Sequence, residues 1–162
     1  MDTELMKKYL EVNKNINRGY RKLDVWIEAV ELNGFVKTEL NEIKTISYKV
    51  KADIEASIFS VGSNIAEGYC RRSLKEYINF INVALGSLGE NYSQIFSLLI
   101  SGDIDEKWFD EYDKLHYSLE NKMIRFNKAN IEKLNSSGEW NDDYKIRELL
   151  ENYDMEQKSM DA

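Results

Sequence analysis

The complete absence of proline constrains this chain more than any other feature of its sequence. Proline breaks helices because it lacks a backbone N–H and clashes with the preceding turn, and none of the 162 residues is a proline. The eight glycines stand mostly where a run of apolar residues at helical spacing ends, which is where a helix gives way to a turn. We therefore predict an all-α chain of long helices and short turns.

Four segments carry apolar residues three or four positions apart, the spacing that places side chains on one face of a helix. Each stripe must pack on another surface in order to leave water, so we expect the four helices to share one core. The stripes are Ala29, Leu32, Val36, Leu40 and Ile43; Val50, Ile54, Ile58, Val61 and Ile65; Tyr77, Ile81, Ala84, Leu88, Tyr92, Ile95 and Leu99; and Trp108, Tyr112, Leu115, Leu119, Met123 and Phe126.

Capping residues mark the ends of the first three helices. Asp24 can cap the first with its carboxylate, and the second runs from near Ser47 to Gly68, a residue suited to a left-handed turn. The third opens with a capping box, in which Ser73 and Glu76 satisfy each other's free backbone donors. We expect each of these residues to lie at a helix end.

The fourth helix begins near Asp103 or Asp105. Because the connections between all four helices are short, consecutive helices should run in opposite directions. We predict an antiparallel up-down-up-down four-helix bundle over residues 21–134, flanked by a short N-terminal extension, 1–20, and an acidic C-terminal tail, 135–162.

Charge is distributed unevenly along the chain. Twenty-two basic against 29 acidic side chains leave a net charge of −7. The stretch from Glu139 to Ala162 holds eight acidic and three basic residues, so most of the excess lies there and the bundle is close to neutral. An acidic chain is not a general nucleic-acid coat protein, because phosphate neutralisation dominates such binding. Docking of the tail on a protein surface and a solvated tail both remain open.

Neither a membrane nor a metal site is indicated. No apolar run reaches the roughly 18 residues of a membrane span, and the N-terminus carries Asp2 and Glu4 where a signal peptide is basic and then apolar, so we expect a cytoplasmic protein. A single cysteine, Cys70, cannot form an internal disulfide, and a single histidine, His116, cannot complete a zinc site. A di-iron bundle needs two Glu-x-x-His motifs, and the nearest match is one Asp113-x-x-His116. We expect no cofactor and no enzymatic activity.

Four polar residues lie on or beside helical faces that should be apolar: Asn64 and Glu67 on the second helix, and Ser87 and Glu90 on the third. Each pair is spaced three apart and therefore shares a face. If these faces meet, the four side chains form a hydrogen-bonded layer that fixes the register of the two helices.

A basic cluster, Arg71, Arg72 and Lys75, lies in the turn between the second and third helices. Guanidinium and ammonium groups bind phosphate, so these residues are the candidate contacts to nucleic acid. Pairing with carboxylates of the same chain or of a neighbouring subunit is the alternative in so acidic a protein.

Together these residues resemble a known family, the small bacterial four-helix-bundle proteins encoded in intervening sequences of 23S ribosomal RNA genes. The resemblance spans roughly residues 20–134 and is carried by four motifs in combination. They are Lys22-Leu23-Asp24-Val25-Trp26, Ser63-Asn64-Ile65-Ala66-Glu67-Gly68-Tyr69, Arg71-Arg72-Ser73 with Glu76-Tyr77, and Ala84-Leu85-Gly86-Ser87-Leu88 with Glu90.

The resemblance implies homo-oligomeric rings, typically pentamers. It also implies kinship with the accessory variability determinant (Avd) of diversity-generating retroelements, which associates with a reverse transcriptase and binds nucleic acid. The chain departs from the family pattern in two ways: Glu55-Ala56 replaces a basic pair, and Gly62 replaces a proline. The loss of the basic pair weakens the implied binding of nucleic acid.

Two functions are therefore compatible with the sequence. The first is a non-enzymatic, homo-oligomeric accessory protein that binds RNA or DNA, with a reverse transcriptase as a further partner. The second is a protein-interaction scaffold that acts through its acidic tail and binds no nucleic acid. Kinship favours the first and composition favours the second.

Overall fold

The computed structural model describes residues 3–137. Every regular element in this range is a helix, and there is no strand among these residues. The all-α prediction is confirmed. The elements are α1 (Thr3–Glu11), the 3-10 helix η1 (Ile16–Lys22), α2 (Asp24–Glu42), α3 (Tyr48–Cys70), α4 (Leu74–Ser101) and α5 (Glu106–Ser137). The predicted acidic tail lies outside the described residues, except for its first three positions, which belong to α5.

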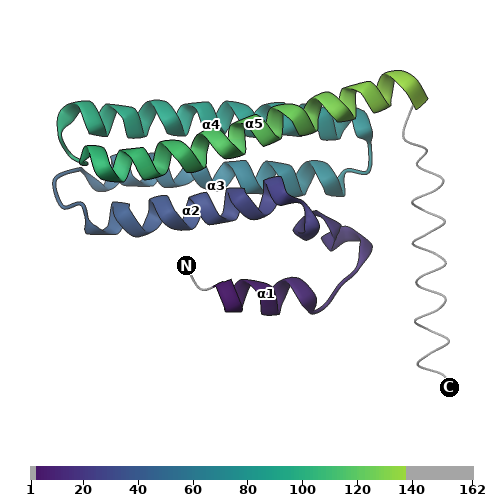
Figure 1. The fold of residues 1–162 in the computed structure, drawn as a ribbon, viewed down its shortest axis with the longest axis horizontal. Coiled ribbons are helices and arrows are strands. Elements are labelled where there is room, and N and C mark those ends of the chain that lie inside the picture. Colours follow the sequence, from purple (N-terminus) through teal and green to yellow (C-terminus); the bar gives the residue numbers. More distant parts are fainter. Residues whose placement is uncertain (1–2, 138–162) are drawn as a thin grey trace.

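The four long helices lie side by side, and the connections between them fall at alternate ends of the molecule (Figure 1). Helix α3 packs against α2 and α4, and α5 packs against the same two helices from the other side. The core between them is built mainly from the predicted stripes, whose central members are almost completely buried, whereas Val50 and Leu115 are exposed and lie outside it. Val36, Ile58, Ile81, Leu88, Ile95, Leu119 and Met123 are each 0% exposed.

The molecule has two halves along the helix axes, and each half is named after a turn that it contains. The α3–α4 half comprises residues 14–33, 60–88 and 117–137, and contains the turn between α3 and α4 together with η1. The α4–α5 half comprises residues 34–59 and 89–116, and contains the two opposite connections, α2 to α3 and α4 to α5. Helix α5 ends in the α3–α4 half, beyond the turn (Figure 1).

Two helix ends differ from their predictions. Helix α2 begins at Asp24, but the N-cap position is occupied by Leu23 and no side chain caps the helix. Helix α3 does not end at Gly68 but continues to Cys70. Gly68 is buried because α4 approaches it closely: a Cβ added there would lie 2.6 Å from Phe80 Cβ. This glycine is required for packing and not for a turn.

The remaining ends are capped, although only the Ser73 half of the predicted capping box is formed among the described residues. Ser47 accepts the Val50 N–H at 3.3 Å, and Ser73 accepts the Glu76 N–H at 3.3 Å. Gly102 ends α4 in the left-handed conformation, with φ of 78°. Asp105 Oδ1 accepts the Trp108 N–H at 2.7 Å, so Asp105 caps α5. Side-chain acceptors thus satisfy backbone donors at the start of three of the four long helices.

The N-terminal extension is helical but adds nothing to the core. None of residues 4–11 is buried. Helix α1 is held at its C-terminal end by Arg21, whose guanidinium donates to the carbonyls of Tyr9 at 2.8 Å and Val12 at 2.9 Å. The 3-10 helix that carries Arg21 packs against α2 and α3.

Candidate nucleic-acid interface

The turn between α3 and α4 presents three basic residues to solvent. Arg71 and Lys75 are exposed and Arg72 is half-buried. The turn is short because α3 ends at Cys70 and Ser73 already caps α4. The structure therefore places the predicted cluster as one group at the end of the molecule.

Arg72 has an unusual backbone conformation, with φ of 60°. For a residue with a Cβ this left-handed conformation costs roughly 1–2 kcal/mol relative to the right-handed one, and glycine is the usual solution. Its guanidinium Nη2 donates to the side-chain oxygen of Asn17, which is a neutral acceptor. No carboxylate among the described residues neutralises Arg72, so its charge remains available to a ligand.

Arg71 behaves differently from its neighbour. Its Nη2 donates to Glu67 Oε1 at 2.5 Å, and its guanidinium lies over the ring of Phe80, 5.4 Å from the centroid. The hydrogen bond and charge of Glu67 raise the pKa of Arg71. This is the carboxylate pairing that the sequence left open, and it holds for Arg71 alone among the three basic residues of the turn.

The short helix η1 closes this end of the molecule beside the turn. Cys70 Sγ donates to the Asn17 carbonyl at 3.3 Å, so both Cys70 and Arg72 hold the same residue of η1. Tyr20 makes edge contacts with Trp26 and Tyr69, with centroid separations of 5.1 and 6.2 Å. These contacts bring the basic residues of η1 to the same end as the turn.

The two halves of the molecule differ strongly in charge. The α3–α4 half carries eleven Lys and Arg against seven Asp and Glu, whereas the α4–α5 half carries six against eleven. Among the described residues of the α3–α4 half, ion pairs involve Lys14, Arg71 and Lys122. Arg125 and Lys128, both exposed on α5, belong to the same half as the turn. The sequence reading missed this segregation because it appears only when the helices are folded side by side.

The predicted polar layer is formed in part. Ser60 Oγ and Ser87 Oγ lie 3.0 Å apart, and Asn64 Nδ2 donates to Ser60 Oγ at 2.8 Å, so Asn64 and Ser87 meet through a residue that the pattern did not single out. Glu67 and Glu90 are exposed and do not join them. A position three residues along a helix is displaced by about 60° around the axis, which carries both glutamates out of the contact.

A second polar network lies deeper and was not predicted. Tyr112 donates its hydroxyl to Asn91 Oδ1 at 2.9 Å, Asn91 Nδ2 donates to Ser57 Oγ at 3.0 Å, and Ser57 donates to Gln94 Oε1 at 2.7 Å. Asn91 and Tyr112 are 0% exposed. The signal available in the sequence was an asparagine directly beside Tyr92 on an otherwise apolar face. The network joins α3, α4 and α5 and fixes their register.

His116 belongs to the core of the protein. It is 3% exposed, and its Nε2 lies 3.0 Å from the Leu88 carbonyl oxygen. Within residues 3–137, no group of three His, Cys, Asp or Glu side chains is placed to hold a metal ion. In the same residues, no helix has both the length and the apolar character that a membrane crossing requires.

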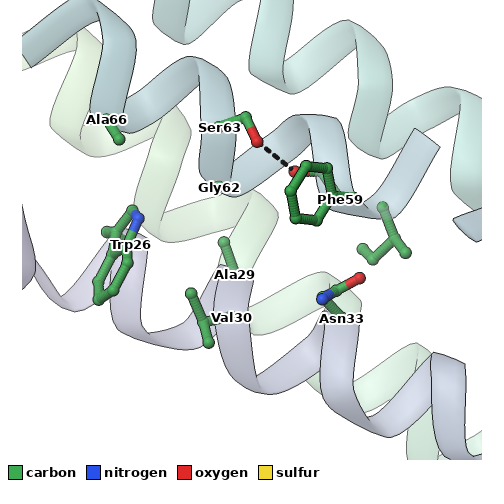
Figure 2. A pocket seen from close by; sticks show the side chains of 9 residues that line it. Trp26, Ala29, Val30, Asn33, Phe59, Gly62, Ser63 and Ala66 are labelled. Atoms are coloured by element: carbon green, nitrogen blue, oxygen red, sulfur yellow. Dashed lines mark hydrogen bonds between the residues drawn. The ribbon is translucent and has the colours of Figure 1, made fainter. Parts of the chain in front are cut away.

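An apolar groove runs between α2 and α3 (Figure 2). It has a volume of about 280 Å³, and Phe59 beside it is 66% exposed. The Ser63 hydroxyl donates to the Phe59 carbonyl at 3.0 Å, so it is satisfied within α3. The groove therefore suits apolar side chains of a protein and not phosphate. Its lining is Trp26, Ala29, Val30, Asn33, Ile58, Phe59, Gly62, Ser63 and Ala66.

Comparison with known proteins adds one finding. A family model described as 23S rRNA-intervening sequence protein matches residues 21–125, which is more than half of the chain. The match covers α2, α3, α4 and most of α5, including the basic turn. No curated protein matches the chain.

Proposed function

The chain belongs to the family of 23S rRNA-intervening sequence proteins, and from this premise we propose that it is a cytoplasmic, non-enzymatic, homo-oligomeric accessory protein that binds nucleic acid through its α3–α4 half. In this proposal the long helices form an antiparallel up-down-up-down four-helix bundle. Kinship with the accessory variability determinant makes a reverse transcriptase the proposed protein partner.

The observation that carries the proposal is the segregation of charge. A chain with a net charge of −7 nevertheless has a half with eleven basic against seven acidic residues. Phosphate binding requires a local cationic surface and not a basic protein as a whole. Arg72 and Lys75 supply such a surface at the end of the molecule, where a helical nucleic acid can approach without contacting the acidic half.

Oligomerisation would strengthen this weak surface. A ring repeats the same patch on every subunit, and simultaneous contacts multiply a modest affinity. The α2–α3 groove is an apolar surface of the kind that subunits bury against each other. From the family resemblance we propose that this ring is a pentamer.

The experiment compares two triple variants of the full chain. Binding of a labelled RNA and of a labelled DNA duplex is measured over a range of salt concentrations, with light scattering to follow oligomer mass. R71A/R72A/K75A should weaken binding and make the slope of log affinity against log salt shallower by about 2–3, since each phosphate contact contributes about 0.7–0.9. The matched control, K44A/K49A/K107A, removes three exposed cations from the α4–α5 half and should leave the slope unchanged.

The same experiment distinguishes the proposed function from the second candidate function. The concentration of negative charge in the tail favours a protein-interaction scaffold that binds no nucleic acid. If the unaltered protein binds neither RNA nor DNA at physiological salt, or if both triple variants change the slope equally, the nucleic-acid proposal is wrong.

A further inference from the structure

Several cations of the α3–α4 half form no ion pair with a carboxylate of the described residues. Arg72 donates to the neutral side chain of Asn17. Lys75, Arg125 and Lys128 are exposed, and none of them forms an ion pair with another described residue. Like charges held together on one surface repel one another, and an anionic ligand relieves that repulsion.

The chain itself carries an anionic segment that follows α5, and α5 ends in this half. Helix α5 ends at Ser137 in the α3–α4 half (Figure 1), and residue 138 follows directly. The segment 139–162 contains eight acidic and three basic residues. Its charge is therefore opposite to that of the half from which it emerges, and like that of the α4–α5 half.

The length of the segment is sufficient for it to reach the turn. A chain spans at most about 3.3–3.6 Å per residue, so half of the segment covers roughly 40 Å. Helix α5 has 32 residues and is about 48 Å long at 1.5 Å per residue, and the turn lies well short of its far end. Attachment to the same chain also keeps the local concentration of the segment at about the millimolar level.

We propose that the acidic segment 139–162 docks on the cationic surface of its own α3–α4 half, around Arg72 and Lys75, and competes there with nucleic acid. The segment presents carboxylates where a nucleic acid would present phosphates. The docking is inferred from the opposite charges of the segment and the α3–α4 half and from the end of α5 in that half. The competition with nucleic acid rests also on the proposed function.

The single cysteine makes the docking measurable in the full chain. Cys70 is exposed and directly precedes Arg71, and Trp140 lies in the acidic segment. A bimane label on Cys70 is quenched when a tryptophan contacts it. We expect quenching at low salt, and its loss in W140F and at about 1 M salt, where the Debye length is about 3 Å.

Two further variants separate charge from proximity. D142N/D143N/E148Q/E151Q keeps Trp140 but removes four negative charges, and it should lose the quenching. The matched control moves the label to the opposite end of the molecule with C70S/K49C, where W140F should make no difference. Because Trp26 lies near Tyr69, the quenching is counted as the difference between the native chain and W140F. A difference that is absent, or that survives the removal of charge, overturns the docking.

Mixed oligomers identify the origin of the segment. A labelled W140F subunit assembled with unlabelled native subunits should remain bright, and quenching in that mixture overturns docking within one chain in favour of a neighbouring copy. The addition of a labelled RNA tests the competition. If the segment occupies its site about nine-tenths of the time, the charge-neutralised variant binds RNA about tenfold more tightly.

The two proposals fail in distinguishable ways. Quenching without any RNA binding overturns the competition and the proposed function but retains the docking. RNA binding without Trp140-dependent quenching retains the proposed function and overturns the docking.

Discussion

The turns at the two ends of the molecule both reverse the chain through one left-handed residue, but one turn is acidic and the other is basic. Between α4 and α5, Gly102 adopts the left-handed conformation. Asp103 accepts hydrogen bonds from Thr45 and Ser101, both at 2.6 Å, and Asp105 caps the next helix. Between α3 and α4, the left-handed position is occupied by Arg72.

The difference shows which charges the fold uses. Carboxylates in the α4–α5 turn accept the Trp108 N–H and the hydroxyls of Thr45 and Ser101, so they have a structural role. In the α3–α4 turn a glycine would suit the backbone better than Arg72, and neither Arg72 nor Lys75 pairs with a carboxylate among the described residues. We infer that the charge of the α3–α4 turn serves a ligand.

The largest effect on stability should come from the close approach of α3 and α4 within the α3–α4 half, which Gly68→Val tests. A Cβ at Gly68 would lie 2.6 Å from Phe80 Cβ and 2.9 Å from Tyr77 Cδ2, so valine forces α3 and α4 apart and should cost about 3 kcal/mol in the free energy of unfolding. Urea denaturation measures the loss. The matched control is Gly86→Val, where an added Cβ meets nothing within 4 Å and the change should stay within about 0.5 kcal/mol. Equal losses at both glycines would contradict the close approach.

The structural role of the acidic turn predicts an intermediate effect. Asp105→Ala removes the acceptor of the Trp108 N–H and should lower the free energy of unfolding by about 1 kcal/mol. Asp105→Asn retains a good capping side chain and should be close to neutral. Thermal unfolding of the two variants distinguishes loss of the cap from loss of the charge.

In the basic turn, a substitution should weaken ligand binding and leave the free energy of unfolding nearly unchanged. Arg72→Gly removes left-handed strain of roughly 1–2 kcal/mol, while the greater freedom of glycine in the unfolded chain opposes this by about 1 kcal/mol. Loss of the contact to Asn17 offsets much of the remainder, so the stability should change by no more than about 0.5 kcal/mol. Binding to labelled RNA should weaken, as in the triple variant. A large loss of stability without loss of binding would give Arg72 a structural role instead.

The smallest effect concerns repulsion in the acidic half. Burial, together with the charges of Asp105, Glu42 and Glu111, raises the pKa of Glu39. The native state therefore binds a proton more readily than the unfolded chain, and its stability falls as pH rises from the ordinary value of 4.5 through the raised pKa. Glu39→Gln should stabilise the protein slightly at neutral pH, and the gain should disappear below pH 4.5. Thermal midpoints across this range measure it; a gain that persists in acid would exclude ionic repulsion.

Much of the helical structure was predictable from local patterns. The stripes identified most of the buried residues, and Ser47, Ser73 and Asp105 mark helix ends because capping depends on residues within one turn of each other. Gly68 was misassigned because a glycine needed for close packing and a glycine needed for a turn have the same sequence pattern. Asp24 was misassigned as a cap because both positions at the start of α2 are compatible with a helix terminus.

Only the central part of the candidate interface, the three basic residues of the α3–α4 turn, was predictable from the sequence. Arg71, Arg72 and Lys75 are close in sequence and therefore close in space. The Asn17 contact, and the presence of Arg125 and Lys128 in the same half, depend on residues that are more than 50 positions from the turn. The buried chain from Tyr112 through Asn91 to Ser57 likewise joins three helices.

The sequence by itself determined which segments become helices, which of their faces become buried, and that the last 24 residues carry most of the net negative charge. These properties depend on spacing within a segment or on composition. Only the tertiary structure decided that cations from η1, α3, α4 and α5 gather in one half, and that α5 ends there, directly before the acidic segment. The physical reason is that the electrostatic field of a surface depends on distances in space, and the packing of one helix on another sets those distances.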